Sequence, residues 1–280
     1  MADYIDKTLL SVVNQNYKNL EYIIIDGNST DDTVSIIKKY ENYITKFVSE
    51  PDNGQYDAIQ KGMKLATGDI LAWLNADDVY FPWTLEIVSK IFTEHTEVNW
   101  ISGMAAFLDE NGQLTNIYNT INARPAALIR RGHFRYGLYG YLQQESMFWR
   151  RELWEKTGGL NLEYRLAGDF ELWTRFARHS EHVTVGLPLA GFRMRAGSRS
   201  KVQEEKYLEE VKKACRNLPG RFSLLARIAS SSQIINKLVR LLVWKKAPVY
   251  YFSMSKQRWF LARRRRPVSS VSFSQLLLEK

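Results

Sequence analysis

Two stretches decide the fold of this chain: LEYIIIDGNSTDDT at residues 20–33 and GDILAWLNADD at residues 68–78. Each contains a short apolar run of the kind that forms a buried strand. The first run ends at Asp26, and the second leads through a short turn to Asp77 and Asp78. Because parallel sheets bind ligands beyond the carboxyl ends of their strands, these aspartates are candidate site residues.

Helical patterns alternate with the strands. The apolar spacing predicts helices over residues 4–13, 34–40, 56–66 and 82–92, with a further short strand over 45–49. Such alternation predicts a parallel, Rossmann-like sheet flanked by helices, which is an α/β fold. Further along, the pattern predicts a hairpin over 100–118, a helix over 169–178 and a strand near 182–185. Trp149 and Trp154 are interpreted as packing residues rather than as platforms on which a ligand stacks.

The length and composition are ordinary for a soluble globular protein. A chain of 280 residues accommodates an α/β domain, expected over residues 1–200, and an extension over residues 201–280. The single cysteine, Cys215, argues against a disulfide framework and against a cysteine-rich zinc site. The sequence shows neither a leader pattern nor an apolar run of the roughly 20 residues that span a membrane. We therefore expect a cytoplasmic protein.

Charge is concentrated in the extension. The chain has 39 Lys/Arg and 30 Asp/Glu, and residues 201–280 hold 18 of the former and 5 of the latter. Apolar residues between Leu224 and Leu242 follow helical spacing, and Arg263–Arg266 form a basic block. A basic helical extension is expected. It either packs on the α/β domain or binds an anionic surface such as the inner face of the plasma membrane. No nucleic-acid-binding module is recognised, and no nucleic-acid partner is expected.

The acidic turn Asn75-Ala76-Asp77-Asp78 suits a metal-bound diphosphate. Mg²⁺ and Mn²⁺ prefer carboxylates together with phosphate oxygens. The sequence contains neither a GxxxxGK[ST] loop nor a GxGxxG turn after a strand, so a glycine cradle for phosphate is not supported. A metal-assisted mode of phosphate binding remains.

Five segments, in order, resemble the family 2 glycosyltransferases of the GT-A fold. They are IIIDGNSTDDT (23–33), EPDNGQYDAIQKGMKLATGDILAWLNADD (50–78), QQESMFWRRELWEKTGGL (143–160), AGDFELWTRFAR (167–178) and FRMRAGSRS (192–200). The resemblance covers about residues 1–200 and is closest to the bacterial branch that builds cell-surface polysaccharide. It implies inverting transfer of a sugar from a nucleotide-diphosphate sugar to a glycan or lipid-linked acceptor, with Mg²⁺ or Mn²⁺.

The resemblance also implies roles for individual residues. Asp26 matches the contact to the nucleoside, and Asn75-Ala76-Asp77 stands at the family's DxD position. Asp77 and Asp78 then share the contacts to ribose and metal, in an order that stays open. The nucleotide pocket is lined by the segment that holds Asn53, Tyr56, Asp57 and Gln60, although Tyr56 is equally well read as a core residue. The donor-sugar and acceptor cleft is shaped by Gln143, Gln144 and Glu145.

Asp169 matches the catalytic base of the family. An in-line displacement requires a carboxylate that takes the proton of the acceptor hydroxyl. The alternative is that Asp169 caps a helix. Many relatives have an acid directly before this position, where this chain has Gly168. Arg195 stands where relatives usually have histidine, and we interpret it either as a phosphate contact or as a solvated surface residue.

One departure concerns the first strand. The family begins with a strand that ends in Thr-Pro-x-Tyr/Phe-Asn, directly before the helix that opens this chain. The resemblance therefore implies a sheet without that strand, either through a start assigned too late or through truncation. Two other functions stay open: a non-catalytic remnant that binds a membrane or a partner, and a nucleotidyltransferase. The latter would require a glycine-rich, lysine-bearing loop after the first strand.

Overall fold

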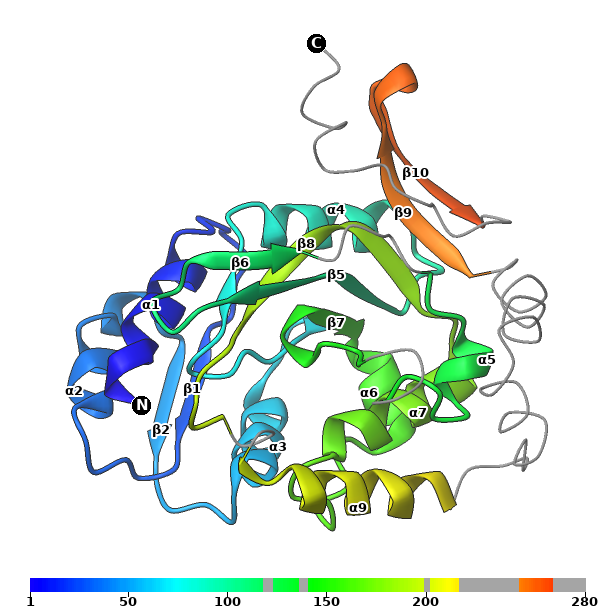
Figure 1. Ribbon diagram of the computed structural model, residues 1–280. Helices are drawn as coiled ribbons and strands as arrows, with labels where there is room; N and C mark the ends of the chain where they lie inside the picture. Colours follow the sequence, from blue (N-terminus) through cyan, green and yellow to red (C-terminus); the bar gives the residue numbers. More distant parts are fainter. Residues whose placement is uncertain (118–122, 136–140, 199–201, 217–246, 264–280) are drawn as a thin grey trace.

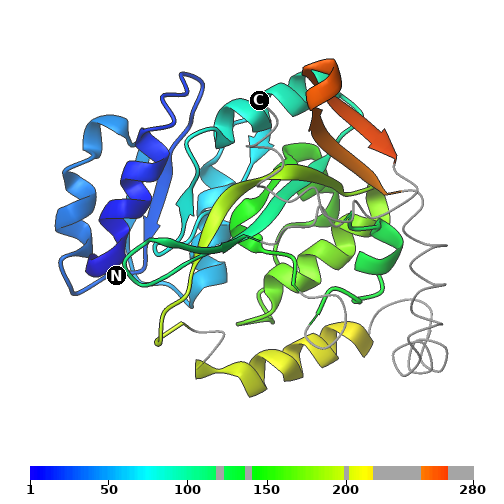
Figure 2. The same ribbon diagram turned by 45° about the horizontal axis from the view of Figure 1, so that its top comes forward.

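The chain folds into a mixed α/β structure, shown from two directions in Figures 1 and 2. The computed structural model describes residues 1–117, 123–135, 141–198, 202–216 and 247–263. The helices are α1 (Ala2–Val13), α2 (Thr33–Lys38), α3 (Gln55–Leu65), α4 (Thr84–Glu94), α5 (Ala126–Ile129), α6 (Arg151–Thr157), α7 (Gly168–His179) and α9 (Glu204–Arg216), and the 3-10 turns are η1 (Glu41–Tyr43), η2 (Gln144–Ser146) and η4 (Met254–Lys256). The strands are β1 (Ile23–Asp26), β2 (Lys46–Ser49), β3 (Ile70–Leu71), β4 (Val79–Tyr80), β5 (Trp100–Leu108), β6 (Leu114–Ile117), β7 (Met147–Arg150), β8 (Val183–Arg193), β9 (Pro248–Ser253) and β10 (Arg258–Arg263).

The larger sheet has the order β10-β9-β8-β5-β7-β3, with β4 paired to β8 and β6 paired to β5. Strand β5 pairs in parallel with β8 and antiparallel with β7. Its side chains alternate between two cores, because successive residues of a strand point to opposite faces. Trp100 packs with Trp173 of α7, and the next residue, Ile101, packs with Ile91 of α4. The sheet therefore lies between two helical layers.

Tryptophans dominate the core on the α7 side of this sheet. Trp73 stacks on Trp173 with ring centroids 5.6 Å apart and meets the edge of Trp149 at 5.2 Å. Trp149 in turn stacks on Trp154 at 5.9 Å, and both of these side chains are buried. The interpretation of Trp149 and Trp154 as packing residues is confirmed.

Strands β1 and β2 form a separate, parallel two-stranded sheet. Helix α1 bridges this sheet and the larger one. Its Leu9 packs in a cluster with Ile24 of β1, and its Val12 packs in a cluster with Ile70 of β3. Strand β3 ends the larger sheet, so within the described part of the chain β1 and β3 each pair with one strand only.

The C-terminal extension differs from the expectation of an all-helical segment. Helix α9 agrees with it, and the helical spacing between Leu224 and Leu242 lies outside the described residues. Pro248–Arg263, however, forms the hairpin β9–β10, and β9 extends the larger sheet in parallel with β8. Aromatic and β-branched residues explain this outcome, since VYYF and WFL favour strands and bury Val249 and Tyr250 on opposite faces.

Candidate active site

Asn75 organises the acidic turn after β3. Its side-chain Nδ2 donates to Asp78 Oδ2 at 3.1 Å and to Gln144 Oε1 at 3.0 Å, and its Oδ1 accepts from Gln55 Nε2 at 2.6 Å. These contacts join the turn to α3 and to η2. An aspartate at position 75 would place a further negative charge against Asp78, which explains why an amide fits where relatives have an acid.

Asp77 and Asp78 occupy different environments. Asp78 is buried, and its Oδ1 accepts from the backbone N–H of Arg193 at 2.9 Å. Burial, with the neighbouring charge of Asp77, raises the pKa of Asp78 to about 7. Asp77 is 17% exposed, and its Oδ2 accepts from Arg195 Nε at 2.6 Å. Asp77 is therefore the carboxylate that can meet a ligand, whereas Asp78 holds the turn against the end of β8.

Two arginines flank this turn: Arg193, the last residue of β8, and Arg195, two residues beyond it. Arg193 is buried and donates to the carbonyls of Asp77, at 2.7 Å, and Glu110, at 3.0 Å. Arg195 pairs with the Asp77 carboxylate and is 18% exposed. The ring of Tyr4 lies against both guanidinium groups, with centroids 5.4 and 5.5 Å away. Arg195 therefore sits in the site as a partly exposed cation, and the role of phosphate contact stays a prediction.

Asp26 lies at the end of β1, as the sequence predicted. Its carboxylate accepts from the Ser29 backbone N–H at 3.0 Å and from Ser49 Oγ at 2.7 Å. Burial raises the pKa of Asp26, but these hydrogen bonds outweigh it and leave the pKa below its ordinary value. Asp26 is thus an ionised, fixed carboxylate. Its side-chain hydrogen bonds within the described residues run to Asn28, Ser29 and Ser49 and not to the acidic turn, so the structure does not join it directly to Asp77.

The start of α3 forms one wall of a pocket. Asn53, Gly54, Gln55, Tyr56 and Asp57 line it on this side. The Asn53 backbone N–H donates to Asp57 Oδ2 at 2.9 Å, which holds the pKa of Asp57 below its ordinary value. Asn53 and Asp57, both predicted as nucleotide contacts, therefore lie side by side, while Gln60 accepts instead from the Leu160 backbone N–H at 3.2 Å.

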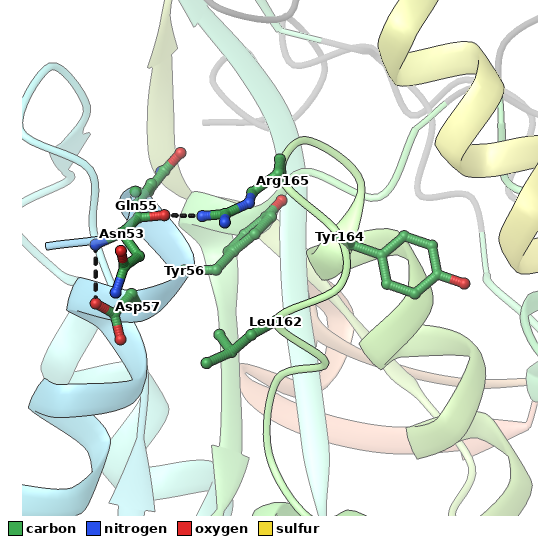
Figure 3. A pocket seen from close by; sticks show the side chains of 8 residues that line it. Asn53, Gln55, Tyr56, Asp57, Leu162, Tyr164 and Arg165 are labelled. Carbon is green, nitrogen blue, oxygen red and sulfur yellow. Dashed lines mark hydrogen bonds between the residues drawn. The ribbon is translucent and has the colours of Figure 1, made fainter.

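The opposite wall is the segment that leads into α7. Leu162, Tyr164 and Arg165 line the pocket there, and its volume is about 230 Å³. Figure 3 shows Arg165 crossing the pocket to donate from Nη1 to the backbone carbonyl of Asn53. This hydrogen bond ties the two walls together. Nothing in the local sequence marks Arg165, because its partner lies more than a hundred residues away.

Asp169 reaches this pocket through Tyr56. The Tyr56 hydroxyl lies 3.1 Å from Asp169 Oδ1 and 2.9 Å from the carbonyl of Leu166. Burial raises the pKa of the half-buried Asp169 to about 6, although hydrogen bonds from the Phe170 N–H and from Tyr56 lower it. Helix α7 begins at Gly168 with Ala167 as its N-cap, so Asp169 does not take the cap position.

Gly168 makes the Tyr56 contact possible. A Cβ at this position would lie 2.8 Å from the Tyr56 ring, which is closer than real Cβ contacts. The space beside Gly168 is filled by the Tyr56 ring. Tyr56 was predicted either to line the nucleotide pocket or to belong to the core. Its side chain is buried, and it also contacts the candidate base.

Buried polar groups adjoin the acidic turn at η2. Both amide atoms of Gln143 and the Oε1 atom of Glu145 are buried without a hydrogen-bond partner among the described residues. Burial, together with the charge of Asp78, raises the pKa of Glu145 well above its ordinary value. Buried polar atoms are rarely left unpaired in folded proteins. Gln143 and Glu145 thus lie buried beside the acidic turn, and their place in the donor-sugar and acceptor cleft stays a prediction.

The chain is similar in sequence to known glycosyltransferases. The family model for "Glycosyl transferase family 2" matches residues 2–156. An uncharacterized glycosyltransferase of Mycobacterium tuberculosis is 30% identical over 198 residues, which cover 68% of this chain and 70% of the relative. A "PGL/p-HBAD biosynthesis glycosyltransferase" of Mycobacterium bovis is 24% identical over 225 residues, which cover 75% of this chain and 80% of the relative.

Solved structures share the fold. S. aureus TarS 1–349, in complex with UDP-GlcNAc, superposes with a TM-score of 0.61 at 16% identity, covering 85% of this chain and 72% of that one. The mannosyltransferase PcManGT from Pyrobaculum calidifontis, in complex with GDP-Man and Mn²⁺, gives a TM-score of 0.57 at 18% identity, covering 86% and 67%. The fold is that of the GT-A enzymes. With the family model matching more than half of its residues, the chain belongs to glycosyltransferase family 2 and is a glycosyltransferase.

Proposed function

We propose that this enzyme transfers a sugar, with inversion, from a nucleotide-diphosphate sugar to a glycan or lipid-linked acceptor in polysaccharide biosynthesis. The observation that carries the proposal is the position of Asp169. It is a half-buried carboxylate beside a pocket, with a pKa of about 6. Asp169 is therefore a stronger base than an ordinary aspartate, and it is still ionised at neutral pH. The donors bound by TarS and by PcManGT support a nucleotide-diphosphate sugar as the donor class.

The reaction that follows is one displacement. The acceptor hydroxyl attacks the anomeric carbon, and a new C–O bond forms there while the bond to the diphosphate oxygen breaks. The hydroxyl proton passes to an oxygen of Asp169, and the bonding electrons leave with the nucleoside diphosphate. Attack from the face opposite to the leaving group inverts the anomeric configuration. Tyr56 holds Asp169 through its hydroxyl, so the accepting oxygens keep a fixed direction.

The residues of the acidic turn fit Mg²⁺ or Mn²⁺ in one respect. Such ions are commonly held by one or two carboxylates together with substrate phosphates. Asp77 is the partly exposed carboxylate that would hold the ion, and Asp78 stays a weaker candidate because both its oxygens accept hydrogen bonds within the fold. The described residues form no group of three or more acidic, histidine or cysteine side chains around one point. When bound, the ion supplies positive charge that stabilises the leaving diphosphate.

Donor binding tests this proposal. We expect Mn²⁺ or Mg²⁺ with UDP or GDP to raise the melting temperature of the protein, and we expect the Asp77→Ala/Asp78→Ala double variant to abolish the rise. Asp77→Ala alone should remove most of it, because Asp77 is the more accessible carboxylate. Asp32→Ala removes an exposed acid next to α2 and serves as the matched control. A shift that persists unchanged in the double variant would exclude both acids from the metal site.

A lipid-linked acceptor would be served by membrane contact, and the basic extension supports this part of the proposal. No helix in the described ranges has the length and apolar content to cross a bilayer. The hairpin β9–β10 exposes Lys256 and Arg258 near its turn and Arg263 at its other end, and in the sequence Arg263 begins the basic block Arg263–Arg266, whose last three residues lie outside the described ranges. Each Lys or Arg near anionic headgroups contributes about 1 kcal/mol to binding. Attachment through such charges is weakened by salt.

Vesicle sedimentation checks the membrane contact. Replacing Arg264, Arg265 and Arg266 together with Gln should weaken binding to phosphatidylserine-containing vesicles by about two orders of magnitude, from roughly 1 kcal/mol per charge. These changes are preferable to deleting residues 221–280, because that deletion removes β9 and uncovers the β8 edge. Phosphatidylcholine vesicles provide the neutral control. Equal sedimentation of the variant and the wild type with anionic vesicles would rule out this contact.

A further inference from the structure

Glu210 of α9 makes an unusual contact with the segment that precedes α7. Its carboxylate accepts three consecutive backbone N–H groups: that of Arg165 at Oε1, and those of Leu166 and Ala167 at Oε2, each at 2.9 Å. Hydrogen bonds from N–H groups to a carboxylate are charge-assisted and stronger than those between neutral groups. These donors lie just before the first turn of α7, where the helix dipole also favours a negative charge.

The held segment connects directly to the candidate site. Arg165 donates to the carbonyl of Asn53 across the pocket. Leu166 offers its carbonyl to the Tyr56 hydroxyl at 2.9 Å, and the same hydroxyl lies 3.1 Å from Asp169 Oδ1. A continuous path therefore leads from Glu210 through Leu166 and Tyr56 to Asp169, and a second contact leads from Arg165 to the opposite wall.

The packing of α9 against the segment before α7 does not depend on the Glu210 carboxylate alone. Val211 and Ala214 are buried in a cluster with Tyr164, Ala167 and Phe170. Figure 1 shows α9 lying along the part of the molecule that holds α6 and α7, in agreement with this cluster. Removing the Glu210 carboxylate should therefore loosen the segment locally while α9 stays packed against it.

We propose that Glu210 is a positioning residue of the active site, which holds residues 165–167 so that Arg165 closes the pocket and Asp169 faces the acceptor. The C-terminal extension thereby completes the catalytic centre. This inference rests on the proposed function, because it takes Asp169 as the base. Helix α9 contacts the segment before Asp169 both through the Glu210 carboxylate and through the cluster of Val211 and Ala214.

Several charged or titratable groups face Asp169, and they determine in which direction each substitution should move its pKa. They are Tyr56 from α3, Glu145 from η2, and Tyr207 and Glu210 from α9. The negative charge of Glu210 raises the pKa of Asp169, whereas the hydrogen bond from Tyr56 lowers it. Glu210→Gln should thus move the pKa of Asp169 down, and Tyr56→Phe should move it up.

The experiment compares Glu210→Gln, Glu210→Ala and the matched control Glu209→Gln, an exposed neighbour on α9. We expect Glu210→Ala to reduce kcat about ten- to hundredfold, as small misplacements of catalytic groups do. Glu210→Gln should retain more activity, because one amide oxygen still accepts from Leu166 and Ala167. Glu209→Gln should match the wild type. Activity is measured with UDP-GlcNAc and GDP-Man, and circular dichroism confirms folding.

Carboxyl NMR titration of Asp169 and amide hydrogen exchange at residues 165–170 give readouts that need no donor. We expect faster exchange throughout this stretch in Glu210→Ala and a lowered Asp169 pKa in Glu210→Gln. The inference is overturned if the Asp169 pKa, the exchange at residues 168–170 and kcat in Glu210→Gln all equal those of Glu209→Gln. If Asp169→Asn is itself fully active, the proposed base is wrong, and that failure is distinct from an inert Glu210.

Discussion

Replacing Asp169 with Asn is expected to lower the rate of sugar transfer by a factor of about 10² to 10⁴, with donor affinity close to that of the wild type. The amide has the shape of the carboxyl group and can still contact the Tyr56 hydroxyl, but it cannot accept the proton of the acceptor. The loss should therefore appear in kcat, because the missing interaction belongs to the transition state.

The pH dependence of kcat in the wild type provides an independent test of Asp169 as the base. Burial raises the pKa of Asp169 to about 6. Below that pH the carboxyl group is protonated and cannot act as a base, so kcat should rise as the pH increases through about 6. The residual activity of Asp169→Asn should lack this rise, since no titrating base remains at that position.

A matched control lies on the same helix. Glu171 pairs with Arg175 at 2.6 Å, one turn along α7, and takes no part in the pocket. Glu171→Gln should leave the rate of transfer unchanged. An Asp169→Asn variant that turns over as fast as Glu171→Gln would refute Asp169 as the base and leave it a structural role at the start of α7.

Periodicity predicted the elements that surround the site, but it could not distinguish residues of the same type. The strands at β1, β2 and β3 and the helices α1, α3 and α7 follow from apolar spacing within single segments. The difference between the environments of Asp77 and Asp78 does not follow from such spacing. It depends on Arg193, more than a hundred residues away, whose backbone N–H donates a hydrogen bond to the Asp78 carboxylate. No local pattern in the sequence could reveal that contact.

The C-terminal extension shows why composition misled. Its lysines and arginines suggested a solvated or membrane-binding helix, yet Pro248–Arg263 forms two strands of the larger sheet. Long basic side chains can stay at the surface while alternate aromatic residues are buried, so net charge says little about secondary structure. Glu210 was missed for a related reason. Helix α9 contains several glutamates, and nothing in the sequence distinguishes Glu210, which accepts from three backbone N–H groups, from the exposed ones.

The ends of the two sheets define a second test with a large expected effect. Strands β1 and β3 each have a second edge on which the described residues place no strand. Helix α1 packs on both strands from one face, through Leu9 and Val12. Helix α3 bridges them as well, since Gly62 lies against Ile25 and Met63 packs with Leu71. The residues of β1 before Asp26 are apolar and only half-buried. Unpaired apolar edges of this kind promote aggregation or pairing with another chain.

We therefore expect the 280-residue polypeptide on its own to associate in solution and to bind nucleoside diphosphates weakly. Adding an N-terminal apolar strand that ends in Thr-Pro-x-Tyr/Phe-Asn should yield a monomer and strengthen binding by at least about tenfold. A strand that paired with both edges would also fix the carboxyl ends of β1 and β3, where Asp26 and the acidic turn lie. A Gly/Ser extension of equal length is the control, and light scattering with calorimetric titration of UDP and GDP provides the measurements. If the 280-residue polypeptide proves monomeric, stable and fully active, then the two edges are not a vacant strand position, and another segment covers them.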